Sequence, residues 1–443
     1  ETAYARPSDS LVISPVEYFD YDKVGTKILE TSRRGQTTLF DFDSLNRPVR
    51  QTDPGVSVNG DGTGGYRVPG QIVTEYDWVG NITAVVDQVG ARVEFTYDML
   101  DRVRTQTDVV RRDNPPADND RYTTTFDYDD LGNQTKVIAP NGATTQYVYT
   151  ALSELDLVID QLLEQTDYDY QFGRLVQVTD PLGRYTTYTH DLAGRQTDVR
   201  SYSPLAVELT HSRSTYLPTG QVETVISPRG FELANEAAFA TVYGYDALGR
   251  LESVETPVDG VRTITTAYGY DEAGNQTRVT DGDGHVTSYS YNSWGLLEST
   301  VEPATTPYPN LADRTFTTSY DAGGLPVHEL MPGSVTLDRL FDELGRLRSV
   351  DGSGDGTASK TFDYDAAGYR TSVSHPSGTI SFVFEDRGLL ESVSGPAGVG
   401  SYTYDESGRL VQRVDAAGTH VFDWTDRNEL DLLTDGVSGV TFD

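Results

Sequence analysis

Residues 270–291 read Tyr270-Asp-Glu-Ala-Gly274-Asn-Gln-Thr-Arg-Val279-Thr-Asp281-Gly-Asp-Gly284-His-Val-Thr-Ser-Tyr289-Ser-Tyr291, and the pattern of turns and strands can be inferred from them. Gly274 and Gly284 tolerate the positive φ that tight turns require. The residues between and after them are rich in Thr, Val and Tyr, which favour strands. The stretch therefore predicts turn, strand, turn and strand, after which Tyr291 opens the next unit.

The same unit recurs along the whole chain. An aromatic anchor followed by Asp-x-x-Gly occurs nine times, starting at Tyr21, Tyr76, Tyr128, Tyr245, Tyr270, Tyr320, Phe341, Tyr364 and Tyr404. Ten degenerate copies start at Phe42, Tyr97, Tyr149, Tyr170, His190, Tyr216, Tyr291, Phe384, Trp424 and Phe442. Their spacing clusters at 20 or 21 residues. Such a period is the mark of a repeat architecture in which each unit is one β-hairpin.

A second aromatic residue precedes many anchors by two positions, as in Phe40/Phe42 and Tyr289/Tyr291. Residues two apart share one face of a strand. Stacked hairpins are therefore expected to align these rings into columns, in which neighbouring aromatic pairs add about 0.5–1.5 kcal/mol each.

Composition limits the classes of function. The 34 Lys and Arg against 68 Asp and Glu give a net charge of −34, which disfavours binding to nucleic acid or anionic membranes. A cation or a basic partner fits such a surface better, although the turns alone also account for much of the Asp. The absence of cysteine excludes disulfides and thiolate metal sites. No run of about 18 apolar residues is present.

We expect residues 1–443 to form a single continuous repeat array. Inserted loops are expected near 53–72, 105–123, 227–241 and 302–314, where the period lengthens. Only Glu232–Phe239 has the Ala, Glu and Leu content of a short helix. Insertions in repeat arrays commonly gather on one face, so these loops are the expected variable contacts.

At Tyr245-Asp-Ala-Leu-Gly-Arg250-Leu251, Phe341-Asp-Glu-Leu-Gly-Arg346-Leu347 and Tyr404-Asp-Glu-Ser-Gly-Arg409-Leu410 the sequence resembles the RHS/YD-repeat family. That family includes bacterial RHS polymorphic toxins, the C components of insecticidal toxin complexes and the animal teneurins. The resemblance implies an all-β fold in which tandem hairpins form a long spiralling antiparallel sheet, part of a hollow shell or barrel. Geometry agrees, because eighteen two-strand periods at about 4.8 Å per strand make a ribbon of roughly 170 Å, too long to stay flat.

The resemblance also implies function. Bacterial members enclose a C-terminal toxin, so we expect a structural wall segment of a secreted or cell-surface protein, with the toxin cargo of the parent polypeptide as its partner. The alternative is a teneurin-like adhesion module that binds a carbohydrate or protein through its outer face and inserted loops. Nothing after Trp424 resembles the family's self-cleavage site, and Asp180-Pro-Leu-Gly183 occupies an ordinary repeat turn. No enzyme activity is expected.

The motif residues are predicted to be structural. The motif Asp, as in Asp246, Asp271 or Asp405, suits a side chain that accepts backbone N–H groups in its turn, in preference to a metal ligand. The motif Arg is expected to pair with carboxylates across strands. The residues assigned to this motif are Tyr21, Asp22, Gly25, Tyr76, Asp77, Gly80, Tyr128, Asp129, Gly132, Tyr245, Asp246, Gly249, Arg250, Tyr270, Asp271, Gly274, Phe341, Asp342, Gly345, Arg346, Tyr364, Asp365, Gly368, Tyr404, Asp405, Gly408 and Arg409.

Two Gly-rich loops are the candidates for a calcium site. Each places oxygen side chains at positions 1, 3 and 5 with Gly at position 6, namely Asn59, Asp61 and Thr63 in one, and Asp351, Ser353 and Asp355 in the other. This is the opening of a calcium loop, but the bidentate Glu at position 12 is replaced by Gly70 and Phe362. Flexible turns with incidental Asp remain the alternative, and no other cofactor is expected.

Catalytic motifs are absent from the sequence. The histidines His190, His211, His285, His328, His375 and His420 show no zinc-protease spacing, and no Gly-x-Ser-x-Gly elbow occurs. Paired carboxylates are too common in so acidic a chain to indicate a glycosidase.

Overall fold

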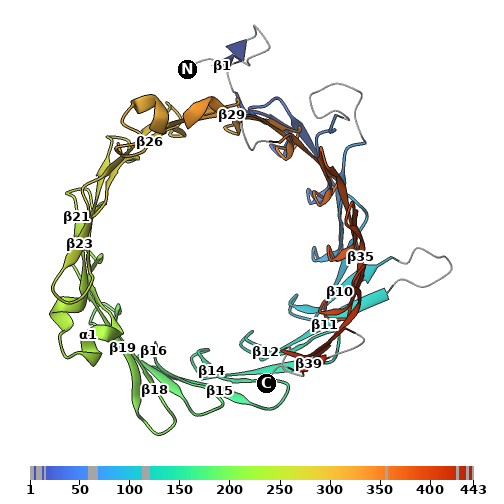
Figure 1. Ribbon diagram of the computed structural model, residues 1–443. Coiled ribbons are helices and arrows are strands. Elements are labelled where there is room, and N and C mark those ends of the chain that lie inside the picture. Colours follow the sequence, from blue (N-terminus) through green and yellow to red (C-terminus); the bar gives the residue numbers. More distant parts are fainter. Residues whose placement is uncertain are drawn as a thin grey trace. The chain divides into compact units, whose positions relative to one another are not determined.

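The computed structural model describes residues 4–5, 12–13, 16–57, 68–111, 120–354, 358–425, 429–435 and 439–441. Nearly all of these residues lie in antiparallel strands or in the turns that join them. Strands follow one another in chain order, each beside the next (Figure 1). The predicted all-β fold of tandem antiparallel hairpins is confirmed.

The chain divides into two compact units. Unit 1 consists of Glu1–Asp127, Lys136–Thr144 and Thr318–Asp443. Unit 2 consists of Tyr128–Thr135 and Thr145–Thr317. The prediction of one continuous array stays a prediction. The strands of unit 1 are β1 (Tyr4–Ala5), β2 (Val12–Ile13), β3 (Tyr18–Tyr21), β4 (Lys27–Thr31), β5 (Thr37–Phe42), β6 (Pro48–Thr52), β7 (Gln71–Tyr76), β8 (Ile82–Val86), β9 (Arg92–Tyr97), β10 (Val103–Val110), β28 (Pro326–Met331), β29 (Val335–Phe341), β30 (Leu347–Ser353), β31 (Lys360–Tyr364), β32 (Arg370–His375), β33 (Gly378–Phe384), β34 (Leu390–Gly395), β35 (Gly398–Tyr404), β36 (Leu410–Asp415), β37 (Gly418–Trp424), β38 (Leu430–Thr434) and β39 (Gly439–Thr441).

The strands of unit 2 are β14 (Leu155–Ile159), β15 (Gln165–Gln171), β16 (Arg174–Thr179), β17 (Tyr185–His190), β18 (Gln196–Tyr202), β19 (Glu208–Tyr216), β20 (Val222–Ile226), β21 (Ala240–Tyr245), β22 (Leu251–Pro257), β23 (Thr263–Tyr270), β24 (Gln276–Thr280), β25 (Val286–Tyr291) and β26 (Leu297–Val301). Four strands have residues in both units: β11 (Asp120–Tyr128), β12 (Gln134–Ile138), β13 (Thr144–Tyr149) and β27 (Thr315–Tyr320).

Among the described residues, helical structure is confined to short pieces in the insertions and one turn. These are α1 (Pro228–Glu232) and the 3₁₀ turns η1 (Glu236–Phe239), η2 (Leu311–Arg314) and η3 (Pro332–Ser334). The helix expected over Glu232–Phe239 is therefore wrong in its bounds. Pro228 starts the helix earlier, because proline suits the first helical position, and Ala234 at φ 50° interrupts it. The loop expected over 105–123 is also too long, since β10 continues to Val110 and β11 begins at Asp120.

Each hairpin turns in the same way at its motif. In the copy at Tyr245, the N–H of Gly249 donates to the carbonyl of Asp246 and the N–H of Asp246 donates to the carbonyl of Arg250, both at 2.9 Å. Gly249 has φ 78°, the left-handed conformation that closes the turn. Tyr245 then pairs with Leu251 but Gly244 pairs with Ser253, which leaves one extra residue in the returning strand. This bulge recurs in the motif hairpins and increases the local twist of the strands.

The ends of the strands opposite the motif carry a second kind of turn. From β4 to β25 most of these repeat the five-residue geometry, as at Asp180–Arg184, where Gly183 donates to the carbonyl of Asp180. From β32 to β37 the turns shorten to two residues, as between His375 and Gly378, which pair directly. The shorter turn accounts for the period of 20 residues in this part of the chain.

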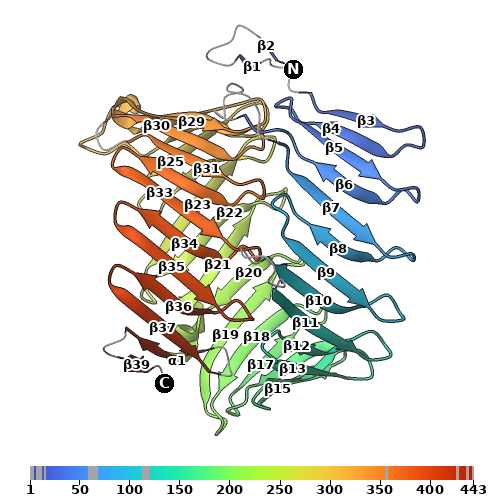
Figure 2. The same cartoon turned by 90° about the vertical axis from the view of Figure 1, so that its right-hand side faces the viewer.

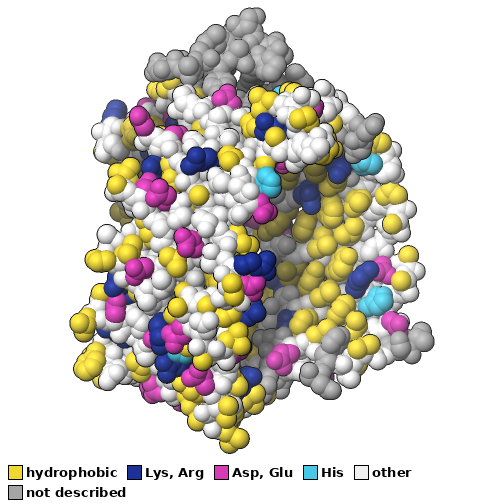
Figure 3. Space-filling view, turned by 60° about the vertical axis from the view of Figure 1, so that its left-hand side comes forward, with side chains coloured by type: hydrophobic (Ala, Val, Ile, Leu, Met, Phe, Trp, Pro, Cys, Tyr) yellow, Lys and Arg dark blue, Asp and Glu magenta, His cyan; other side chains and the backbone are white. Residues whose placement is uncertain are grey.

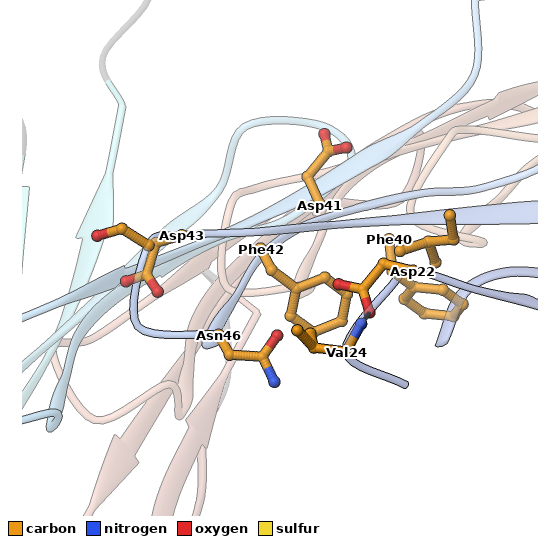
Figure 4. A pocket seen from close by; sticks show the side chains of 9 residues that line it. Asp22, Val24, Phe40, Asp41, Phe42, Asp43 and Asn46 are labelled. Carbon is orange, nitrogen blue, oxygen red and sulfur yellow. Dashed lines mark hydrogen bonds between the residues drawn. The ribbon is translucent and has the colours of Figure 1, made fainter. Parts of the chain in front are cut away.

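Side chains alternate between the two faces of the sheet. Figure 4 shows a shallow hollow beside two neighbouring motif turns, where Phe40 and Phe42 of β5 point to one side and Asp41 points to the other. The buried hydrophobic residues of the described chain are few: Ala84, Ala91, Val109, Val110, Ile226 and Phe239. Acidic, basic and hydrophobic side chains are mixed on the face shown in Figure 3. The described residues of each unit thus form a sheet one layer thick, without a second layer to form a globular core.

Within unit 1, strands from the two ends of the chain lie edge to edge. Figure 2 shows β3–β10 beside β29–β37, and hydrogen bonds join residues separated by 275 to 308 positions. The turns opposite the motif in β4–β11 meet the motif turns of β28–β34. We call this line of contact the ribbon seam and define it by Arg34, Ser57, Arg111, Asp321, Asp342, Glu343 and Asp386.

Candidate functional site

The motif Asp holds its own turn. Asp246 Oδ1 accepts the N–H groups of Leu248 and Arg250, both at 2.9 Å, and its Oδ2 accepts Nε of Arg250 at 2.7 Å. These hydrogen bonds hold the pKa of Asp246 below its ordinary value, and the bond from the backbone N–H of Arg250 has the largest effect. Where Asn replaces Arg, as at Asn275, its amide donates to Oδ2 of Asp271 at 2.9 Å. The carboxylate is thus fully occupied by its turn.

The motif Arg links each hairpin to the next. Arg250 Nη1 donates to the carbonyl of Asp271 in the following motif at 3.0 Å, and its guanidinium carbon lies 4.7 Å from the ring centre of Tyr270. The hydroxyl of Tyr270 donates back to the carbonyl of Leu251 at 2.8 Å. We call this set of an Asp, its Arg and the next anchor ring the repeat clamp.

The repeat clamp recurs in both units. The same Arg-over-ring contact joins Arg47 to Tyr76, Arg195 to Tyr216, Arg250 to Tyr270, Arg346 to Tyr364 and Arg409 to Trp424. Two sequence expectations change. The motif Arg pairs with the Asp of its own turn and not across strands. The expected columns of stacked rings are largely mixed, with guanidinium groups over the anchor rings; Tyr185 and Tyr202 are one pair that does stack, at 4.7 Å.

The ribbon seam in unit 1 begins at Arg34. Its Nε lies 2.9 Å from Oδ2 of Asp321, and its Nη1 and Nη2 donate to the carbonyls of Asp342 and Phe341 at 2.5 and 3.1 Å. Gly323 makes room for this side chain, because a Cβ there would lie 2.7 Å from the Arg34 stem. One arginine therefore fastens two motif turns of the facing ribbon.

The seam continues through a buried contact and an ion pair. The N–H of Ser57 donates to Oε2 of Glu343 at 3.0 Å, and Asp342 beside it is fully buried. Further along, Arg111 donates its backbone N–H to Oδ2 of Asp386 at 2.7 Å and its Nη2 to Oδ1 at 2.5 Å. Burial alone raises the pKa of Asp386, but the hydrogen bonds from Arg111 outweigh it, so the pKa is lowered.

Sequence reasoning missed the seam, although a pattern for it exists. The two residues before the motif Gly are small or charged in three turns at the seam, namely Ala322-Gly323, Ala366-Ala367 and Asp386-Arg387, whereas the fourth, at Asp342, has Glu343-Leu344. In the first motif turns of unit 1 they include Val24, Leu45, Trp78 and Met99 instead. Small or charged residues are thus common, but not universal, in the turns that another ribbon edge covers.

The calcium candidates are only partly described. Asn59, Asp61, Thr63 and Asp355 lie outside the described residues. Asp351 and Ser353 belong to β30, where Asp351 faces Asp338 of β29 and the Ser353 hydroxyl lies 2.6 Å from that of Thr336. The described residues hold no group of three or more acidic or histidine side chains that could bind a metal ion. The calcium site stays a prediction.

One buried histidine forms a polar cluster in unit 2. His211 is 6% exposed, its Nε2 lies 2.7 Å from Oδ1 of Asp198, and its ring stacks on Phe231 of α1 at 3.5 Å. Arg213 bridges Asp198 and Glu236, so the cluster holds both α1 and η1 against β19. Burial opposes ionisation of Asp198, yet hydrogen bonds from His211 and Arg213 lower its pKa to about 2. The contacts of His211 are those of an anchor for the insertion.

Across the described part of the chain, helices are too short and too polar to pass through a lipid bilayer.

The family model described as RHS Repeat matches residues 168–201, 245–286, 270–307, 341–380 and 384–420. These segments contain the copies of the repeat clamp at Arg250 and Arg346. Within the matched segments, the family model falls on the motif turns and bulged hairpins described above.

One curated relative is the Double-stranded DNA deaminase toxin A of Burkholderia cenocepacia (strain H111), 27% identical over 202 residues, which are 45% of this chain and 12% of that protein. The crystal structure of TcdB2-TccC3 without its hypervariable C-terminal region is similar over 95% of this chain and 26% of that chain, with a TM-score of 0.72 and 13% identity. The structure of a Tc holotoxin pore from Photorhabdus luminescens is similar over 95% of this chain and 28% of that chain, with a TM-score of 0.64 and 13% identity. The chain spans about an eighth of the toxin and about a quarter of the solved chains.

Proposed function

Since this chain carries RHS repeats, we propose that it forms part of the wall of a protein shell that encloses a polypeptide cargo. The observation that carries the proposal is the ribbon seam of unit 1. There the edge of one stretch of ribbon is sealed against another by Arg34, Glu343 and the Arg111–Asp386 pair. A one-layer sheet whose edges seal against each other makes a continuous wall.

The chemistry of the clamp fits a wall and not a catalyst. The motif carboxylates are occupied by their own turns, and the motif arginines by carbonyls and rings. We therefore assign the chain a structural role without enzyme activity. Its partner in this role is a toxin segment of the same polypeptide, and its place of action is outside the producing cell or on its surface. The similarity to a named toxin and to Tc toxin complexes supports this assignment.

Protease protection tests the proposal. The full-length polypeptide that contains this chain is digested with a nonspecific protease, beside its cargo segment expressed alone. The shell proposal expects the cargo to survive in the full-length protein under conditions that degrade the free segment. Equal rates of cargo degradation in both samples would contradict it.

Adhesion through the inserted loops is a second candidate, favoured by exposed apolar side chains in the insertion at 302–314. Tyr308 is 57% exposed and Leu311 is 59% exposed. An exposed Tyr ring of this kind stacks on sugars or fills a pocket in a protein partner. This candidate expects the chain to bind on a glycan or receptor array, with Tyr308→Ser reducing the binding. An array without binding would contradict it.

A further inference from the structure

The motif copy at Tyr21 lacks the arginine of the repeat clamp, and Thr26 stands in its place. The turn is otherwise that of a complete clamp, because Oδ1 of Asp22 accepts the N–H of Thr26 at 2.9 Å. The hydroxyl of Thr26 donates to Oδ1 of Asn46 in the next motif turn at 2.8 Å. Thr26 therefore has no guanidinium group to place over the next anchor ring, which is that of Phe42.

The groups that hold the arginine in a complete clamp are nevertheless all in place. Such a clamp offers a carboxylate oxygen to Nε, the carbonyl of the next motif Asp to Nη1, and the face of the next anchor ring. Here these groups are Oδ2 of Asp22, the carbonyl of Asp43 and the ring of Phe42. Among the described residues, no side chain donates to either oxygen and no cation lies over the ring.

These groups border the hollow drawn in Figure 4. Phe42 lies there among Asp22, Val24 and Asn46. The hollow has a volume of about 590 Å³, within the range of sites that take small molecules. A hairpin before Tyr21 would present its arginine to the ring of Tyr21 and not to that of Phe42. The hollow is thus a feature of two neighbouring hairpins of unit 1 alone.

The ribbon seam shows an arginine from a distant segment completing such a clamp. The motif copy at Tyr320 has Leu325 in place of the arginine. Arg34 supplies the missing group, because its Nε lies 2.9 Å from Oδ2 of Asp321 and its Nη1 donates to the carbonyl of Asp342 at 2.5 Å. These are the two acceptors that the motif Arg uses in a complete clamp. A clamp without its own arginine can therefore bind one from elsewhere.

Other copies without the arginine use their acceptors from within. Asn275 donates to Oδ2 of Asp271 at 2.9 Å. The ring of Tyr369 stacks on the next anchor ring, that of Phe384, with 5.1 Å between their centres. Thr26 does neither, so the acceptors of its clamp stay open to an arginine from another segment.

We propose that the hollow over Phe42 binds the guanidinium group of an arginine side chain that another polypeptide segment presents. A guanidinium lies flat on a ring and donates in two directions, which an ammonium group cannot match. The carboxylate of Asp43 is already paired with Arg47 at 2.6 Å, whereas that of Asp22 pairs with no cation among the described residues. Free arginine carries a carboxylate of its own, which these aspartates repel, so an arginine within a polypeptide suits the site better. The inference does not depend on the shell proposal.

Methyl NMR of the isoleucine-labelled chain tests the proposal, because Ile28 lines the hollow. N-acetyl-arginine amide is titrated beside free arginine and beside the corresponding amides of lysine and of citrulline, which has the same shape without the charge. The arginine amide is expected to shift the Ile28 signal to saturation. The lysine amide and free arginine are expected to bind about threefold more weakly, and the citrulline amide is not expected to saturate the site.

Three variants locate the binding. Thr26→Arg supplies the arginine from within, so it is expected to abolish binding and to raise the melting temperature. Leu131→Arg adds the same charge to an exposed motif turn of unit 2 and is expected to bind as wild type. Asp22→Asn keeps the acceptor that holds the turn but removes the charge, so binding should weaken about tenfold.

Four results would overturn the proposal. They are the absence of a saturable shift, binding of any of the other three compounds as tight as that of the arginine amide, wild-type binding by Thr26→Arg or Asp22→Asn, and loss of binding in Leu131→Arg. If Asp22→Asn loses its β-sheet circular dichroism, Thr26→Arg decides, since it adds a side chain that the other clamps already contain.

Discussion

The guanidinium of Arg250 lies over the ring of Tyr270, and the hydroxyl of Tyr270 returns a hydrogen bond to Leu251, the residue beside Arg250. Each hairpin thus holds the anchor of the next, and each anchor holds the hairpin before it. Since the contact repeats along both units, stability is expected to be a sum of hairpins and of the interfaces between neighbours.

Replacing Tyr270 with Phe removes one hydroxyl from the clamp. We expect the free energy of unfolding to fall by about 1 kcal/mol, the usual net value of one hydrogen bond. The matched control is Tyr268→Phe on the same strand, since Tyr268 donates no hydrogen bond to any described residue and should change little. Denaturant unfolding measures both. Equal effects of the two substitutions would show that the hydroxyl of Tyr270 does not stabilise the clamp.

Replacing Arg250 with Lys keeps the charge but loses the planar group. Lysine cannot reach Asp246, the carbonyl of Asp271 and the Tyr270 ring together, so the melting temperature should fall. Arg262→Lys is the control, because Arg262 pairs with Asp259 in a turn but is 74% exposed. The Arg250 substitution is expected to lower the melting temperature more than the Arg262 substitution. The reverse order would show that the clamp does not stabilise the array.

Much of the hairpin architecture could be predicted from the sequence, because it is local. Gly274 and the Asp of its turn lie three residues apart, and the alternation of side chains follows from the strand itself. The partner of Arg250 could not be predicted so simply. The bulge after each motif shifts the register by one residue, and this brings the Arg over the next ring instead of opposite a cross-strand carboxylate.

The seam could not be predicted from the sequence for another reason. Arg34 and Asp342 are separated by 308 residues, and their meeting depends on twist accumulated over many strands. The small residue Gly323 was visible in the sequence, but its meaning requires knowing which edge is covered. Local reasoning can also mislead. The Gly-rich stretch that contains Asp351 and Ser353 was expected to be a loop, but β30 continues through it as far as Ser353.

Substituting Asp386 with Asn weakens the seam without touching the clamps. Asn cannot match the two charged contacts of Arg111, so amide hydrogen exchange should quicken around Arg111 and Asp386. Exchange in β15 and β16 of unit 2 should stay as in the wild type. Asp351→Asn serves as the control, since it makes the same chemical change away from the seam. Unchanged exchange at Arg111 would mean that the pair does not hold the seam.

Acid should release the insertion that carries α1 and η1. The pKa of Asp198 is lowered from 3.8 to about 2, so its stabilising effect is complete above about pH 5 and is lost as the pH falls toward 2. Limited pepsin digestion between pH 4 and pH 2 measures this through cleavage within Pro228–Phe239. The insertion around Leu311–Arg314 provides the internal control. Asp198→Asn should make the Pro228–Phe239 insertion cleavable already at pH 4, and cleavage that does not depend on this substitution would contradict the assignment.

Cryo-electron microscopy of the full-length polypeptide that contains this chain tests the central claim most directly. We predict a wall one sheet thick, with hairpins stacked along it and the seam closed at Arg34 and Arg111, around a cavity that holds density for the cargo. A solid particle, or an open filament of hairpins without an enclosed volume, would contradict the proposal that this chain is a shell wall.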